Sequence, residues 1–197
     1  MKTPLSFIFC LLMISGNATY AQQNAYARPS KSTTREFIET AKFYRINRDW
    51  NVVAEFKSGY DEYVRFFPVE VINLKNNQKI KALGLDMYVL GMKKKKKKGF
   101  ETAWIGLDEI QEFITFIEKH ILPNLNLKFK KKSSKFIFHA KEMTMSYSVR
   151  EKKRRLTIDM NNYHLVDGVG NTSSFNFWTE TQIDKLPKLL EVLKKIK

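Results

Sequence analysis

Cysteine is almost absent from the 197-residue chain, because Cys10 is the only one. Cys10 lies inside an N-terminal apolar run that has the features of a removable export signal. A mature chain without cysteine has no disulfide and no thiolate nucleophile, so it must fold on its hydrophobic core alone. The remaining length is sufficient for one domain with such a core.

Histidine is scarce as well: His120, His139 and His164 are the three in the chain, and none has a second histidine nearby. A metal site needs several His, Cys or carboxylate ligands at short, fixed spacing, so we expect no metal centre. Serine nucleophile elbows and glycine-rich phosphate loops are missing too, and we expect no cofactor. These absences favour a binding protein over an enzyme.

The first 21 residues have the three parts of a secretory signal peptide. Lys2 supplies a positive charge, the ten-residue apolar run 5–14 follows, and small residues lead to Ala21. A membrane-spanning helix needs about 20 apolar residues, so this run is too short to remain as an anchor. The region resembles the export signals of Gram-negative envelope proteins. We predict that 1–21 is removed, that 22–32 is a flexible leader, and that the protein is periplasmic or secreted.

The chain carries few acidic residues for its number of basic ones. Lys and Arg total 35 against 20 Asp and Glu, which gives a formal net charge of +15. A field of this sign attracts anionic polymers and membrane surfaces. Export excludes chromosomal nucleic acid, so the candidate partners are acidic polysaccharide, lipid headgroups, an acidic protein surface or extracellular nucleic acid.

Apolar periodicity predicts an α+β fold with an antiparallel sheet and helices on one face. Alternating residues indicate β-hairpins over 83–105 and 143–160, and helical spacing indicates helices over 107–121 and 179–196. The first helix should end before Leu122-Pro123. In the second, Pro187 favours either a kink or a single turn near Thr179 followed by a helix that begins close to Pro187. A short N-terminal helix is expected over 34–46.

The two halves of the expected domain, 33–197, look alike. A shift of 73 positions superposes Trp104 on Phe177, Ile105 on Trp178, and the apolar face of the first helix on that of the last. We therefore predict a divergent hairpin-strand-helix repeat, with halves at about 80–123 and 135–197. The alternative is chance, because two amphipathic helices aligned on their apolar faces always match in part. The three aromatic residues Trp104, Phe177 and Trp178 are expected in the core.

Basic residues cluster at predicted turns and linkers, and these are the candidate binding residues. The candidates are Lys93, Lys94, Lys95, Lys96, Lys97 and Lys98 in one hairpin tip, and Lys152, Lys153, Arg154 and Arg155 in the other. A further run, 128–135, is also rich in lysine. If the tips share an edge, they form one patch that holds an anionic polymer by many salt-sensitive contacts. The alternative is that they are solvated turns that keep sheet edges apart.

Two other functions remain open at this point. Tyr163, His164 and Asp167 lie in a long loop, 161–174, which is the candidate site if the protein is a small envelope hydrolase. The loop is equally typical of an ordinary Asn/Gly turn region. A structural or inhibitory domain that buries an apolar sheet face against a partner protein is the other alternative.

Sequencing the N-terminus of the protein isolated from its host tests the export signal. We expect the mature chain to begin at Gln22, because the apolar run and the small residues before it form a cleavage site. A chain that begins at Met1 would contradict both the predicted location and the choice of partners that depends on it.

Overall fold

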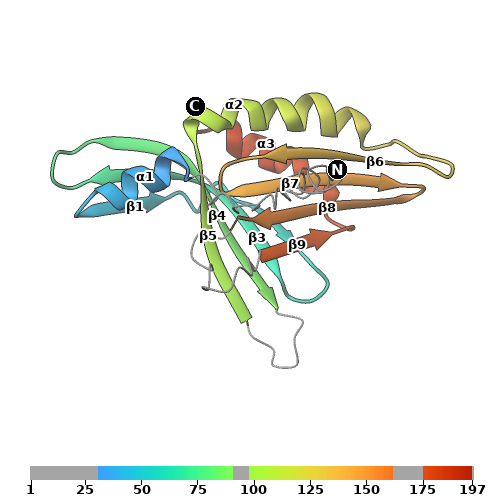
Figure 1. Ribbon diagram of the computed structural model, residues 1–197, viewed down its shortest axis with the longest axis horizontal. Coiled ribbons are helices and arrows are strands. Elements are labelled where there is room, and N and C mark those ends of the chain that lie inside the picture. Colours follow the sequence, from blue (N-terminus) through green and yellow to red (C-terminus); the bar gives the residue numbers. More distant parts are fainter. Residues whose placement is uncertain (1–30, 91–97, 162–174, 197) are drawn as a thin grey trace, which may run out of the picture.

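The computed structural model describes residues 31–90, 98–161 and 175–196, and has a mixed α+β fold of two antiparallel sheets and three α-helices (Figure 1). The helices are α1 (Thr33–Thr40), α2 (Leu107–Thr115) and α3 (Leu186–Lys194). The strands are β1 (Tyr44–Arg48), β2 (Ala54–Lys57), β3 (Tyr63–Asn73), β4 (Lys79–Leu90), β5 (Lys98–Gly106), β6 (Ser133–His139), β7 (Met143–Arg150), β8 (Lys153–Met160) and β9 (Phe175–Thr179). No helix in these ranges is long and apolar enough to span a membrane.

The first sheet has the order β1-β3-β4-β5, and β2 also pairs with β3. Strand β3 is long enough to hold β2 along its first half and β1 along its second half. Pro68 lies between the two halves, between Phe66, which pairs with Ala54, and Val69, which pairs with Arg48. A proline has no N–H to donate, and the change of partner strand at this point accommodates it.

The second sheet has the order β6-β7-β8-β9 and is built mainly from the predicted hairpin 143–160. Its residues alternate as the sequence indicated. Met143, Met145 and Tyr147 of β7 are buried on one face, together with Leu156 and Ile158 of β8. Strand β9 packs beside β4, so the two sheets meet there.

One hydrophobic core joins both sheets to α2 and α3. It contains Leu83 and Leu85 from β4, Tyr147 from β7, Phe113 from α2 and Leu189 from α3, all with no exposed surface. The two helices thus pack against the buried faces of both sheets. The residues of this core come from positions that span most of the described chain.

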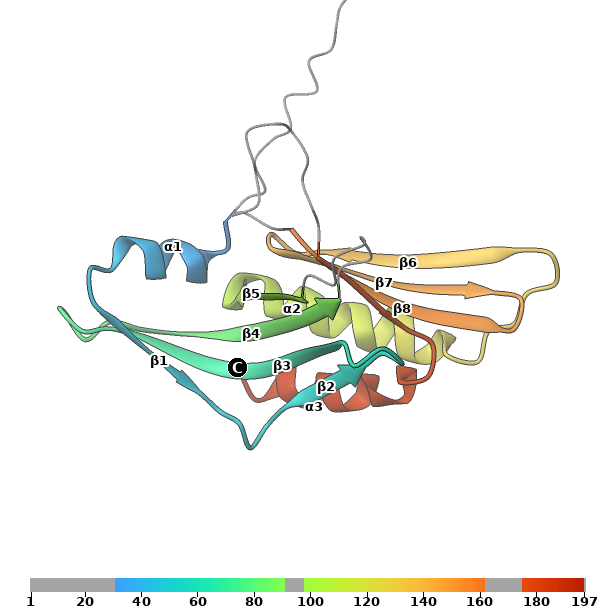
Figure 2. The same ribbon diagram turned by 90° about the horizontal axis from the view of Figure 1, so that it is seen from below.

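Helix α1 packs on the opposite face of the first sheet from α3 (Figure 2). There Ile38 covers a small second cluster that includes Phe67 and Trp104. Phe67 lies across from Gly84, and a Cβ atom at Gly84 would stand 2.4 Å from the Phe67 ring. Glycine is therefore required at position 84, because the buried ring occupies the space of any larger side chain.

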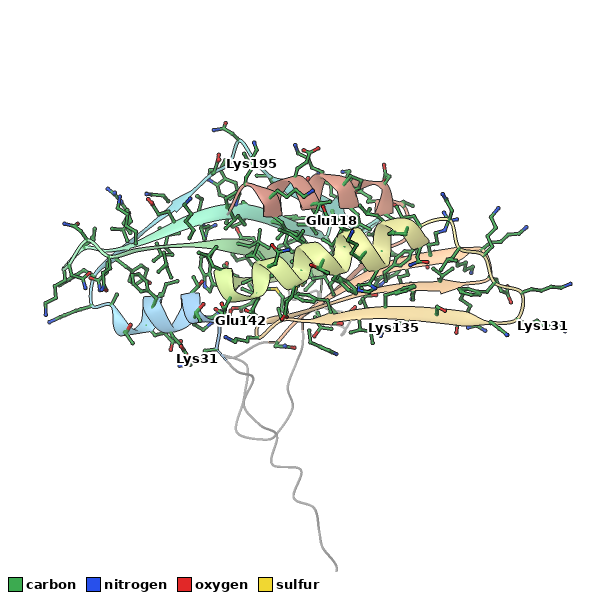
Figure 3. All side chains as sticks on the ribbon, turned by 90° about the horizontal axis from the view of Figure 1, so that it is seen from above. Lys31, Glu118, Lys131, Lys135, Glu142 and Lys195 are labelled. Atoms are coloured by element: carbon green, nitrogen blue, oxygen red, sulfur yellow. The ribbon has the colours of Figure 1, made fainter. Side chains whose placement is uncertain are left out.

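A buried carboxylate, Glu142, ties the parts together at the turn between β6 and β7. It accepts hydrogen bonds from the Ser32 N–H at 3.1 Å and Oγ at 2.6 Å, the Arg35 Nε at 2.9 Å and Nη2 at 2.6 Å, and the Trp104 N–H at 3.0 Å. We call these four residues the Glu142 junction. Its carboxylate is 2% exposed and lies where α1 and α2 begin (Figure 3).

Several sequence-based expectations are corrected by the structure. There are two sheets instead of one. The N-terminal helix, expected over 34–46, ends at Thr40, because Tyr44–Arg48 pairs with β3 as a strand. After Thr115 the helix of 107–121 becomes a π-helix over Phe116–Ile121, followed by a 3₁₀ turn, Leu122–Asn124. Trp178 is 36% exposed, since it lies on the face of β9 opposite the buried Phe177.

Other expectations are confirmed. Both hairpins form, as β4–β5 and β7–β8. The final helix begins close to Pro187, as the second alternative predicted, because α3 starts at Leu186 with Pro187 in its first turn. The turn before it lies at Ile183–Lys185 and not near Thr179, which is the last residue of β9. Proline is well accommodated there, since first-turn N–H groups have no helical partner.

In the predicted internal repeat, corresponding strand residues should lie on corresponding faces of the sheets, and they do not. Superposing Trp104 on Phe177 pairs a residue of the α1-covered cluster with one of the main core. The helical parts correspond better, because Phe113 and Leu186 are both fully buried. In addition, α2 follows β5 directly, whereas residues 180–185, with the 3₁₀ turn Ile183–Lys185, separate β9 from α3. The duplication stays a prediction.

Candidate functional site

Two basic segments that are far apart in sequence meet at one end of the second sheet. Strand β6 begins at Ser133, which pairs with Arg150 at the end of β7. The backbone N–H of Phe129 donates to the carbonyl oxygen of Glu151 at 3.4 Å, which closes the segment before β6 onto the β7–β8 turn. We call the result the basic tip; its members are Lys128, Lys130, Lys131, Lys132, Arg150, Lys152 and Lys153.

Local backbone geometry explains the shape of the basic tip. Glu151 has φ of 55° and Lys131 has φ of 57°, so both residues adopt the left-handed conformation of tight turns. Between these turns lies an open hollow of about 390 Å³, lined by Lys131, Lys132, Ser133, Arg150 and Glu151. The hollow is polar and holds three cations around one carboxylate.

The charge of the basic tip is largely uncompensated. Residues 128–132 and 150–153 contain seven cations and one carboxylate, Glu151, which gives a net charge of +6. All seven basic side chains are exposed. Within the described ranges none of them forms an ion pair, whereas Lys141, Arg155 and Lys194 each bind a carboxylate. The tip therefore offers free cations to an outside partner.

Of the four candidate residues on the β7–β8 hairpin, Lys152 and Lys153 belong to the basic tip and two do not. Arg155 donates to Glu180 at 2.7 Å and lies over the Trp178 ring at 4.5 Å. Arg154 lies on the other face of the strand and lines a hollow with Leu125 and Asp184. Strand alternation separates these neighbours, so the four do not act as one cluster.

The lysine run is placed only in part. Lys93–Lys97 lies outside the described residues, and the backbone of Lys98 pairs with Leu90 at the start of β5. In Figure 1 the described ends of β4 and β5 point to the bottom of the view, whereas the β7–β8 turn lies at the right-hand end. The structure thus brings together two of the three basic clusters, and they lie on one sheet.

The other candidates give no described site. Tyr163, His164 and Asp167 of the loop 161–174 lie outside the described residues. His139 shares a hydrogen bond of 3.1 Å with Thr144 on the neighbouring strand. Among the residues that the structure places, no group of His, Cys, Asp and Glu is arranged to hold a metal ion.

Two acidic residues, Asp108 and Glu109, lie next to each other in the first turn of α2. Asp108 accepts from Thr33 at 2.9 Å and from the Lys141 ammonium at 2.8 Å. Glu109 accepts from the Lys141 N–H at 2.7 Å through Oε1, while its buried Oε2 has no hydrogen-bond partner among the residues that the structure describes. These bonds link α1, α2 and the β6–β7 turn, so the cluster has a structural role beside the Glu142 junction.

The pKa values of the two carboxylates are shifted in opposite directions. Burial opposes ionisation of Asp108, but hydrogen bonds from Lys141 and Thr33 and the lysine charge outweigh it, so its pKa is lowered. For Glu109 burial is the largest effect, and it raises the pKa. Burial of the Glu109 side chain thus holds its pKa above the usual range.

Comparison with known proteins adds no assignment: no protein-family model matches the chain, and a search of curated proteins finds no significant match. The function must therefore be argued from the residues themselves.

Replacing Glu109 by Gln tests the structural role of this cluster. Because the folded pKa of Glu109 is raised, stability linked to this group is complete below the unfolded pKa and is lost as pH rises through the folded pKa. Glu109→Gln removes that loss, so the variant should gain unfolding free energy relative to the parent as pH rises from about 4 to about 7. Urea unfolding across that range measures the difference.

The exposed Glu112 on the same helix provides the matched control, because Glu112→Gln makes the same chemical change in contact with water. This variant should stay within about 0.5 kcal/mol of the parent in unfolding free energy, as exposed substitutions usually do. A relative loss of stability in Glu109→Gln with rising pH would show that the ionised carboxylate is favoured in the fold, against the account above.

Proposed function

We propose that the protein is an exported, noncatalytic binding protein of the cell envelope that holds an anionic partner through its basic tip. The observation that supports this function is the meeting of 128–132 and 150–153 in one exposed cluster of net charge +6. Lys152 and Lys153 contribute from the β7–β8 turn, and the lysine run Lys93–Lys98 adds a second contact on the other hairpin.

The chemistry of the tip defines how it binds. Six of its seven cations are lysines, and lysine presents a point charge without the bidentate fork of arginine. Binding of repeated negative charges then depends on release of counterions and falls steeply with salt. Such contacts tolerate many anionic partners, including acidic polysaccharide, lipid headgroups and an acidic protein surface.

The tip is also held rigidly enough to act as a site. Its two segments are joined by the Phe129–Glu151 backbone hydrogen bond and by the pairing of Ser133 with Arg150. Cations that the fold already holds in place lose less conformational entropy on binding than the same cations on a flexible chain. This geometry favours recognition over simple solvation of two turns.

The test is a salt titration with three anionic probes: heparin, vesicles that contain phosphatidylglycerol, and polyglutamate. We expect binding at low salt to at least one probe, and a loss of about tenfold or more when Lys131, Lys132, Lys152 and Lys153 are all replaced by Gln. Replacing Lys93–Lys98 by Ser and Gln should weaken binding further. Fluorescence anisotropy or vesicle sedimentation provides the dissociation constants.

The matched control removes the same charge elsewhere. Lys42, Lys75, Lys79 and Lys81 are exposed around the start of β1 and the β3–β4 turn, at the left end of Figure 1. Changing these four to Gln should reduce binding by less than about twofold at moderate salt. Equal losses in both variants would show that net charge alone acts and would contradict a site at the tip, as would no binding at low salt.

A further inference from the structure

The outer edge of β6 is open. Strand β6, seven residues long, lies at the end of the order β6-β7-β8-β9, and in the described part of the chain no strand pairs with its other side. Such an edge presents a row of N–H and C=O groups at the spacing of a strand. Another extended backbone is the partner that satisfies this row along its length.

A groove of about 480 Å³ runs beside this edge, between β6 and α2. Its walls include Glu112, Thr115, Phe116, His120, Phe136 and Ile137. Phe116 stacks on the buried Phe138 with 5.6 Å between ring centroids, and Phe138 stacks on Phe113 with 4.7 Å. The apolar walls fit an apolar side chain, and Glu112 disfavours a carboxylate inside the groove.

The helix wall of the groove is irregular at the same place. The π-helix Phe116–Ile121 begins directly after Thr115. Short π-helical segments are rare and occur frequently at functional sites. The wider turn places the rings of Phe116 and His120 on one wall, with 6.4 Å between their centroids.

Charge decides which occupant fits the edge. Lys131 and Lys132 directly precede β6, and the exposed Lys135 lies within it (Figure 3). A second copy of the chain, with its formal charge of +15, would bring like charges together. An acidic strand meets opposite charge from the basic tip along to Lys135, which favours it over self-pairing.

We infer that β6 binds an extended, acidic segment of a partner protein as an added strand. This inference rests on the proposed function, because it assigns a partner class to the basic tip. Side chains alternate between the faces of a strand, so one set of the partner's side chains enters the groove and the other lies on the face of Lys135. Apolar residues suit the first set and carboxylates the second.

The test uses the purified protein and a labelled, blocked peptide of alternating Glu and Leu. We expect saturable, salt-sensitive binding and slower amide exchange in β6. The same peptide with N-methylated backbone amides keeps its charge and side chains but cannot donate hydrogen bonds to the edge. Its affinity should be at least about tenfold weaker.

A matched pair of variants tests the groove. Thr115→Trp fills it from an exposed helical position, and Thr40→Trp makes the same change at an exposed position of α1. Both threonine hydroxyls bond the carbonyl four residues earlier, so the local cost is the same. Thr115→Trp should weaken peptide binding about tenfold, and Thr40→Trp should leave it within about twofold.

Equal binding of the two peptides, or no binding of the unmodified one, would overturn the added strand. If heparin or vesicles still bind through the tip in that case, the proposed function stands and the partner is not a protein strand. If no anionic probe binds, the proposed function itself is wrong. Equal effects of the two Trp variants would also contradict the role of the groove.

Discussion

The buried carboxylate of Glu142 is the contact on which the arrangement of the protein depends. Five donors from Ser32, Arg35 and Trp104 surround it, and they come from the start of α1 and from β5. A buried charge is tolerated only when it is paired and fully hydrogen-bonded. The Glu142 junction therefore fixes the β6–β7 turn of the second sheet against the first sheet.

The basic tip lies at the other end of the same strand pair. Strand β7 runs from Met143, beside the junction, to Arg150 in the tip, a span of about 23 Å at the usual rise of a strand. One end of the second sheet is thus anchored by the buried Glu142 carboxylate, which forms an ion pair with Arg35. The other end carries cations that form no ion pair within the described ranges. The edge of β6 that has no partner strand among the described residues runs between these two ends, and the proposed binding surface lies along it.

The spacing of apolar residues predicts many of the strands and helices. The remaining elements depend on contacts between residues far apart in the sequence, which apolar spacing does not reveal. Alternation identified the hairpins β4–β5 and β7–β8, and helical spacing identified α2. The strand β1 was hidden because Tyr44 and Ile46 fit a helical face as well as a strand. Ser32 and Glu142 are 110 positions apart, and no local pattern predicts their contact. The sequence alone identifies 150–153 as a basic cluster. Its proximity to 128–132 follows only from the pairing of β6 with β7, in which Ser133 lies opposite Arg150.

The most direct test of the shared basic tip is lysine acylation followed by mass spectrometry, with and without bound heparin at low salt. If 128–132 and 150–153 form one site, Lys131, Lys132, Lys152 and Lys153 should lose reactivity together, while Lys42, Lys75 and Lys79 keep theirs. Uniform protection of all these lysines, or protection of one segment without the other, would contradict the account.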